Sequence, residues 1–132
     1  MWTYQQVDGL LSHNGEKIYH GYSGFAEGKN NPAMQNVANM GPLPCGSYTI
    51  GAARDLQGGP HGPFVLPLAP SPNNQMFGRA GFLMHGDLIN QPGAASHGCI
   101  ILPRQIRQMI ASSGDNHITV VAGAAVAAKL GE

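Results

Sequence analysis

The chain has 132 residues, with seven basic residues (Lys and Arg) balanced by seven acidic ones (Asp and Glu). Charged residues make up 11% of it, well below the usual share of about a quarter, so neither a nucleic acid nor an anionic membrane is expected as its main partner. Nineteen glycines and ten prolines separate short apolar runs, which favours one β-rich domain with many turns over a helical bundle.

No stretch approaches the roughly 20 apolar residues that a membrane-spanning helix needs. The first six residues, Met-Trp-Thr-Tyr-Gln-Gln, lack the basic start and apolar core of a secretory signal. We therefore expect no membrane insertion and no export by the general secretory route, although a mature chain without its signal would look the same.

Large and polar residues alternate from position 2 to position 7, which predicts a strand. Asp8-Gly9 predicts a hairpin turn into a second strand at 10–13, and Asn14-Gly15 repeats the turn signal before residues 16–22. We therefore expect three short antiparallel strands at the start of the chain.

A short helix is predicted between Asn31, which can cap it, and Gly41, which can end it. Met34, Val37 and Ala38 fall at helical spacing between them. The pair Asn30-Asn31 is interpreted as capping and turn chemistry rather than ligand binding, and the ligand alternative stays open.

Strands are predicted at 47–50 and 64–66, with loops at 54–63 and 67–74. Cys45 precedes the first of these strands and is interpreted as a small, half-buried apolar residue. A disulfide from Cys45 to Cys99 is disfavoured because it would block the more reactive thiol, and a redox lock stays open. Four histidines are interpreted as surface or strand residues: His13, His20, His61 and His117.

The stretch from Gly81 to Ile101 contains the residues with catalytic potential. A strand at 81–84 ends at His85, and an insert leads to Ser96-His97-Gly98-Cys99. A free cysteine has a pKa of about 8.5 and needs a cation, an imidazolium or backbone dipoles to become a thiolate near neutral pH. A shift of about two pKa units takes about 2.7 kcal/mol, which a nearby His85 and a few N–H groups can supply.

Gly98 permits a tight turn before Cys99, so that adjacent N–H groups can face an oxygen bound beside the sulfur. Pro103 suits the first position of a helix that ends near Gly114. Its apolar face is expected to hold Ile106, Met109 and Ile110, with Arg104 and Arg107 on a solvated face. A final strand is predicted at 117–121.

The pattern His-Gly, a short insert and Ser-His-Gly-Cys with a following aliphatic residue resembles the catalytic motif of L,D-transpeptidases, the cysteine enzymes that remodel peptidoglycan stem peptides. The chain as a whole resembles the L,D-transpeptidase-like effectors of type VI secretion systems. The resemblance covers nearly everything from Trp2 to Val121. The segments that carry it are Gly21-Tyr-Ser-Gly24, Asn30-Asn-Pro-Ala-Met-Gln35, Gly41-Pro-Leu-Pro-Cys-Gly-Ser-Tyr-Thr-Ile50, Gly78-Arg-Ala-Gly-Phe82, His85-Gly-Asp87 and Ala95-Ser-His-Gly-Cys-Ile-Ile-Leu102.

The resemblance implies that Cys99 is the nucleophile and His85 the general base and acid. It implies that Ser96 orients the histidine, often through its main-chain carbonyl. The N–H groups of Gly98 and Cys99 match the oxyanion hole, and His97 matches a position that lines the site.

The chain departs from many L,D-transpeptidases at Ile101, where they carry an arginine. A positive charge for a substrate carboxylate would then have to come from Arg79 or Arg104. Asp87 is a further candidate, for orienting a histidine or a substrate amine, and a turn-stabilising role is at least as well supported.

The resemblance implies an α+β, mainly β fold, a mixed β-sandwich with short helices. We expect one catalytic domain over residues 1–122 and a tail over 123–132. The implied reaction is attack of Cys99 on the peptide carbonyl of the stem's third residue, a diamino acid, with loss of the terminal D-alanine. Water would then give L,D-carboxypeptidase activity, a D-amino acid would give exchange, and another stem would give a cross-link.

No cofactor or metal is expected. The expected partners are the stem peptide, D-amino acids and a cognate immunity protein, and the expected place of action is the periplasm of a target cell after type VI delivery. Two alternatives stay open. One is a Cys2His2 zinc site made of Cys45, His85, His97 and Cys99, for which His97-x-Cys99 is an unusual spacing; the other is an inactive cell-wall-binding module.

Overall fold

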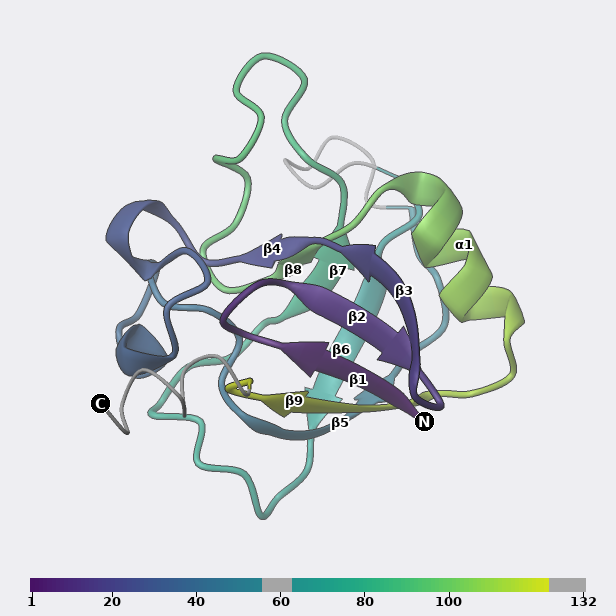
Figure 1. Ribbon diagram of the computed structural model, residues 1–132, viewed down its shortest axis with the longest axis horizontal. Coiled ribbons are helices and arrows are strands. Elements are labelled where there is room, and N and C mark those ends of the chain that lie inside the picture. Colours follow the sequence, from purple (N-terminus) through teal and green to yellow (C-terminus); the bar gives the residue numbers. More distant parts are fainter. Residues whose placement is uncertain (56–62, 124–132) are drawn as a thin grey trace.

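The computed structural model describes residues 1–55 and 63–123, which form mainly short strands with one α-helix (Figure 1). His61 and almost all of the predicted tail, residues 124–132, lie outside the described part of the chain. Within that part, no helix has the length and apolar character needed to cross a membrane.

Nine strands form one mixed sheet in the order β3-β2-β1-β9-β5-β6-β7-β8-β4. Their bounds are β1 Trp2–Gln5, β2 Leu10–His13, β3 Glu16–His20, β4 Tyr22–Ser23, β5 Gly46–Ile50, β6 Leu66–Pro70, β7 Leu83–His85, β8 Ile100–Ile101 and β9 His117–Val121. The pairs β1 with β9 and β7 with β8 are parallel, and the other neighbouring pairs are antiparallel.

The two edge strands of this sheet, β3 and β4, are separated in the chain only by Gly21. A Cβ on Gly21 would lie 2.3 Å from the carbonyl oxygen of Ile101 in β8, so the absence of a side chain lets this corner pack against the opposite edge. The sheet is therefore nearly closed on itself. The prediction of a mixed, mainly β domain is confirmed, and the two-layered sandwich is not.

The predicted N-terminal strands are confirmed as β1, β2 and β3, with antiparallel registers that place Trp2 opposite His13 and Leu11 opposite Tyr19. The second turn has the backbone that its sequence predicts, because Asn14 and Gly15 both have positive φ, 51° and 87°. The predicted segment 16–22 is divided, since its last residue begins β4.

The core lies inside the curved sheet, where inward-facing side chains from eight strands and the helix meet. Burial of each large apolar side chain stabilises the fold by about 1.5–3 kcal/mol. The largest buried apolar residues include Trp2, Tyr4, Leu11, Leu43, Tyr48, Leu66, Met84, Ile100, Leu102 and Ile118.

The predicted helix after Pro103 is confirmed as α1, Arg104–Ser112, with Ile106 and Ile110 buried. Met109 is 45% exposed and does not belong to the buried face. The prediction of a solvated Arg107 is wrong, because this side chain is only 6% exposed. Its guanidinium donates to three carbonyl oxygens in two neighbouring segments, those of Leu102 and of the adjacent residues Pro63 and Phe64.

The predicted helix between Asn31 and Gly41 is wrong except for its first turn. Asn31 does cap it, since Oδ1 accepts from the N–H of Ala33 at 3.1 Å, but the segment forms only a 3-10 turn, η2, Pro32–Met34. None of its residues is buried, so no core contact stabilises a longer helix. A second 3-10 turn, η1, Ala26–Gly28, has no counterpart in the prediction.

The predicted loop at 67–74 is also corrected, because its first four residues belong to β6, Leu66–Pro70. Two prolines made this segment resemble a loop, yet a proline can still accept hydrogen bonds, as the carbonyl of Pro67 does from the N–H of Gly51. Phe64 lies outside the strand with φ of 57°, so the predicted strand at 64–66 is shifted along the chain.

Candidate active site

His85 and Cys99 are brought together by two adjacent parallel strands (Figure 1). His85 ends β7 opposite Ile101, and Cys99 directly precedes β8. Because strand side chains alternate between faces, the register places Cys99 beside Leu83, on the same face as His85. The N–H of Leu83 donates to Cys99 Sγ at 3.3 Å, which agrees with this placement.

His85 is buried, with 2% exposure, and a contact with the residue that follows it fixes the orientation of its imidazole. Nδ1 lies 2.8 Å from the carbonyl oxygen of Gly86. A carbonyl only accepts, so Nδ1 carries the proton in this contact and Nε2 is the basic nitrogen of the neutral ring. The backbone is fixed as well, because the N–H of Leu102 donates to the carbonyl of His85.

Ser96 holds the turn that presents Cys99. Its fully buried Oγ accepts from the N–H groups of Gly24 and Gly98, at 2.9 and 3.1 Å, and donates to the carbonyl of Cys99 at 2.5 Å. One O–H and two lone pairs are thereby all used. The resemblance implied that Ser96 orients the histidine, whereas the carbonyl that binds His85 Nδ1 belongs to Gly86 and the Ser96 hydroxyl serves the turn.

The same turn uses one of the two N–H groups expected to form the oxyanion hole. The N–H of Gly98 points to Ser96 Oγ, and its carbonyl accepts from the Ser23 hydroxyl at 3.1 Å. An oxyanion hole that includes the Gly98 N–H therefore requires this donor to leave Ser96.

Only glycine fits at position 98, because its backbone conformation and its close neighbours exclude a side chain. Its φ is 136°, and a Cβ built there would lie 2.6 Å from both Arg79 Nη2 and Phe82 Cε1. The glycine expected from turn chemistry is thus also required by close packing.

The thiol of Cys99 is 8% exposed, and burial raises its pKa above the ordinary value. The N–H of Leu83 and the charge of Arg79 act in the opposite direction without overcoming burial. In this conformation burial therefore outweighs the groups that would lower the pKa. Formation of a thiolate then calls for a base that takes the proton of the sulfur.

Arg79, a candidate for binding a substrate carboxylate, is 8% exposed and committed to the protein backbone. Nη1 donates to the carbonyls of Gln35 and Pro42 at 2.6 and 2.8 Å, and Nη2 to those of Gly41 and His97 at 2.9 and 3.2 Å. All four N–H groups at the ends of the guanidinium are used, which leaves no end-on pair for a carboxylate.

Arg104, the other candidate, lies at the start of α1 and is exposed. Its guanidinium lies over the ring of Phe64, 5.5 Å from the centroid. The structure does not place it in contact with the His85–Cys99 pair through any hydrogen bond or ion pair among the described residues.

Asp87 accepts four hydrogen bonds, one from Tyr22 in β4 and three from N–H groups of the β7–β8 connection. The Tyr22 hydroxyl donates at 2.6 Å, the N–H of Leu88 at 2.8 Å, and the N–H of Gly93 at 2.9 and 3.1 Å to the two oxygens. The partial burial of this carboxyl acts to raise its pKa, but these hydrogen bonds hold the pKa below the usual range. The geometry corresponds to the turn-stabilising alternative.

His97 and Cys45 are held by other parts of the chain. His97 Nδ1 lies 2.9 Å from the carbonyl oxygen of Asn39, and its ring packs on Phe25. Cys45 Sγ donates to Gln6 Oε1, and both cysteines are free thiols.

Among residues 1–55 and 63–123, no three His, Cys, Asp or Glu side chains are grouped to hold a metal, so the zinc alternative has no ligand set there.

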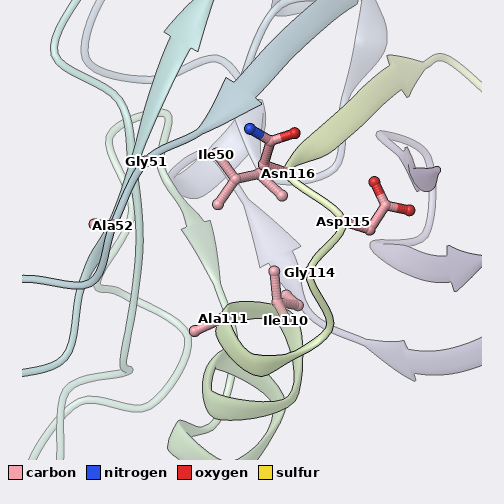
Figure 2. A pocket seen from close by; sticks show the side chains of 8 residues that line it. All are labelled: Ile50, Gly51, Ala52, Ile110, Ala111, Gly114, Asp115 and Asn116. Atoms are coloured by element: carbon pink, nitrogen blue, oxygen red, sulfur yellow. The ribbon is translucent and has the colours of Figure 1, made fainter.

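Among the hollows lined by described residues, one lies beside the site and another lies away from it. One, of about 270 Å³, lies next to the site and is lined by Tyr19, His20, Gly21, Tyr22, Asp87, Ile101, Leu102 and Pro103. The other, of about 260 Å³, lies at the C-terminal end of α1 and contains none of the candidate residues (Figure 2). Its one carboxylate, Asp115, is bound by the Met1 ammonium at 2.7 Å and by His13 at 2.9 Å.

Sequence reasoning missed two contributors to this site, Tyr22 and Ser23. Tyr22 and Ser23 lie within the matching segment Gly21-Tyr-Ser-Gly24, a signal that they are needed but not of what they bind. Sequence reasoning also missed the burial of Arg107, a residue of α1 outside the site, because that burial depends on the packing of α1 against the chain around Phe64.

Comparison with curated proteins finds no significant match. The family model described as the Tlde1 domain matches residues 17–124, which include every candidate site residue. This match covers well over half of the chain, and the family is one of type VI secretion effectors. The chain therefore belongs to the Tlde1 domain family, as an antibacterial effector of type VI secretion systems.

Proposed function

We propose that this effector is a cysteine L,D-carboxypeptidase and L,D-transpeptidase that removes or exchanges the terminal D-alanine of peptidoglycan tetrapeptide stems. The observation that carries the proposal is the buried pair on β7 and β8. Cys99 and His85 share one face of the sheet, and the Gly86 carbonyl holds the imidazole in the tautomer that a general base needs.

In the first half of the reaction, His85 Nε2 takes the proton of the Cys99 thiol, and the sulfur attacks the peptide carbonyl carbon of the third stem residue. The carbonyl oxygen becomes an oxyanion, for which the Cys99 N–H is a candidate donor. When the tetrahedral intermediate collapses, the C–N bond breaks and the imidazolium returns its proton to the departing D-alanine amine.

In the second half, an acceptor resolves the thioester. Water, deprotonated by His85, yields a tripeptide stem; the amine of a free D-amino acid yields an exchanged tetrapeptide; and the amine of another stem yields a cross-link. Trimming and exchange would both deprive the target wall of tetrapeptide donors, which suits an antibacterial effector. This activity places the substrate in the periplasm of the target cell, where a cognate immunity protein would have to cover the Cys99 site.

The test is mass spectrometry of purified muropeptides incubated with wild type, Cys99→Ala and Cys45→Ala, with and without added D-methionine. Wild type and Cys45→Ala should release D-alanine from tetrapeptides or replace it with D-methionine, and Cys99→Ala should do neither. Cys45→Ala is the matched control because its thiol lies outside the site and bonds to Gln6. Full activity of Cys99→Ala would contradict the proposal, and no turnover by reduced wild type would favour a wall-binding module.

A further inference from the structure

The guanidinium of Arg79 is a buried cation without an acidic partner in the described part of the chain. Its four hydrogen bonds at the two end nitrogens all go to neutral carbonyls. The ion pairs found among the described residues involve only Asp115, with Met1 and His13, so no Asp or Glu there neutralises Arg79. Hydrogen bonds to carbonyls satisfy its donors, but a buried charge still favours a nearby opposite charge.

The guanidinium of Arg79 lies beside the turn that carries the nucleophile. Nη2 donates to the carbonyl of His97, and it would lie 2.6 Å from a Cβ on Gly98. These two residues immediately precede Cys99, whose thiol is the nearby group that can become negative. In a poorly solvated site the attraction between such charges is several times stronger than in water.

We propose that Arg79 is the positioning residue whose charge stabilises the Cys99 thiolate, rather than the ligand of a substrate carboxylate. The proposal rests on the proposed function only in that the thiolate is the reactive form; the ionisation of the thiol is measurable without any turnover. It also accounts for Ile101, which stands two residues after the cysteine where many L,D-transpeptidases carry an arginine. In this chain the positive charge beside the turn comes from Arg79, in the loop between β6 and β7, instead of from a residue of β8.

Other groups near the thiol act on the same ionisation and must be separated from Arg79. His85 lies on the same face of the sheet, and the N–H of Leu83 donates to the sulfur. Tyr48 and Cys45 interact electrostatically with each other, and Tyr48 also with Arg79; burial raises the pKa of both. For Cys99, burial raises the pKa and Arg79 opposes that rise.

The experiment measures the rate of alkylation of Cys99 by iodoacetamide against pH, read at each cysteine by peptide mass spectrometry. Arg79→Gln should raise the pKa of the Cys99 thiol by about one unit or more, and Arg79→Lys, which keeps the charge without the fork, should recover more than half of that shift. Arg107→Gln is the matched control, because Arg107 is equally buried and also binds carbonyls, those of Leu102, Pro63 and Phe64. An unchanged thiol in Arg79→Gln, or an equal shift in Arg107→Gln, would overturn the proposal.

A second measurement applies if Arg79→Gln does not fold, as judged by circular dichroism. Arg79→Lys keeps the positive charge, whereas Arg79→His places there an imidazole with an unperturbed pKa of about 6.5, which is mostly neutral in the alkaline range where thiols titrate. Cys99 should be alkylated with a higher midpoint pH in Arg79→His than in Arg79→Lys, and equal midpoints would overturn the proposal. A shifted thiol in a protein that turns over no muropeptide would leave the Arg79 assignment standing and remove only the proposed reaction.

Discussion

The connection between β7 and β8 has two halves that are built differently. In the half nearer Cys99, Ser96 and Gly98 are buried and the Ser96 hydroxyl is fully hydrogen-bonded. In the other half, residues 87–95 project from the body of the protein (Figure 1), and Ile89 is 96% exposed. That half is attached at its base, where Asp87 binds Tyr22 and Tyr22 accepts from the N–H of Ala95.

This difference separates two functions within one loop. The buried half fixes the sulfur, because any shift there leaves polar groups unsatisfied or atoms overlapping. The projecting half has few buried contacts, so it can open locally at low cost while the turn stays closed. Variants in the two halves should therefore differ in kind, those of the turn affecting global stability and those of the projecting half affecting only its own order.

The largest effect is expected from Gly98→Ala. The new Cβ would overlap both Phe82, which packs in the core, and the Arg79 guanidinium, which four hydrogen bonds hold in place. We expect a loss of about 3 kcal/mol of unfolding free energy from the clash and the positive φ together, measured by urea denaturation, and loss of muropeptide turnover.

Gly81→Ala is the matched control for that variant, because Gly81 also has positive φ, 81°, but a Cβ there would meet nothing within 4 Å. It should cost about 1 kcal/mol from backbone strain alone. Equal losses in the two variants would show that packing around Gly98 does not constrain the turn.

A slightly smaller effect is expected from Ser96→Ala, which leaves the buried N–H groups of Gly24 and Gly98 without their acceptor. The unfolding free energy should fall by about 2 kcal/mol, again measured with urea. Ser112→Ala is the control, since this exposed hydroxyl bonds only to carbonyls of its own helix. A loss in Ser96→Ala no larger than in the control would contradict the assigned role.

The sequence predictions succeeded or failed according to whether a structural feature depends on neighbouring residues or on distant segments of the chain. The early strands, α1 and β9 were predictable because alternation, turn dipeptides and a proline at the helix start act over a few residues. Local signals therefore sufficed for these elements. The pairing of His85 with Cys99 was implied instead by the resemblance to the catalytic motif of L,D-transpeptidases.

Predictions failed where distant segments decide the outcome. Arg79 and Arg107 were read from sequence as a substrate ligand and a surface residue, yet each is buried and binds carbonyls from other loops. The Gly98 N–H was expected at the oxyanion, but Ser96 Oγ, two residues away, accepts it. The helix expected after Pro32 has no core to pack on, so spacing alone was misleading.

A local effect is expected from Tyr22→Phe, which removes the hydroxyl shared by Asp87 and Ala95. The hydroxyl is only partly buried, so we expect a global loss of about 0.5–1 kcal/mol but a clear rise in hydrogen exchange across residues 87–95. Tyr19→Phe is the control, since Tyr19 is 40% exposed and has no side-chain hydrogen bond among the described residues. Unchanged exchange in Tyr22→Phe would mean that the loop is held by something else.

The smallest effect concerns the charge of Asp87. Hydrogen bonds from Tyr22, Gly93 and Leu88 hold the pKa of this carboxyl below its unfolded value, which is about 3.9. The folded carboxylate is therefore favoured, its contribution is complete above the unfolded pKa, and it is lost as the pH falls through the lower folded pKa. On acidification below about pH 4, the exchange protection of the Leu88 and Gly93 amides should fall in wild type, whereas in Asp87→Asn it should already be low and change little. Protection that is retained at low pH in wild type would show that the carboxylate does not order the projecting half.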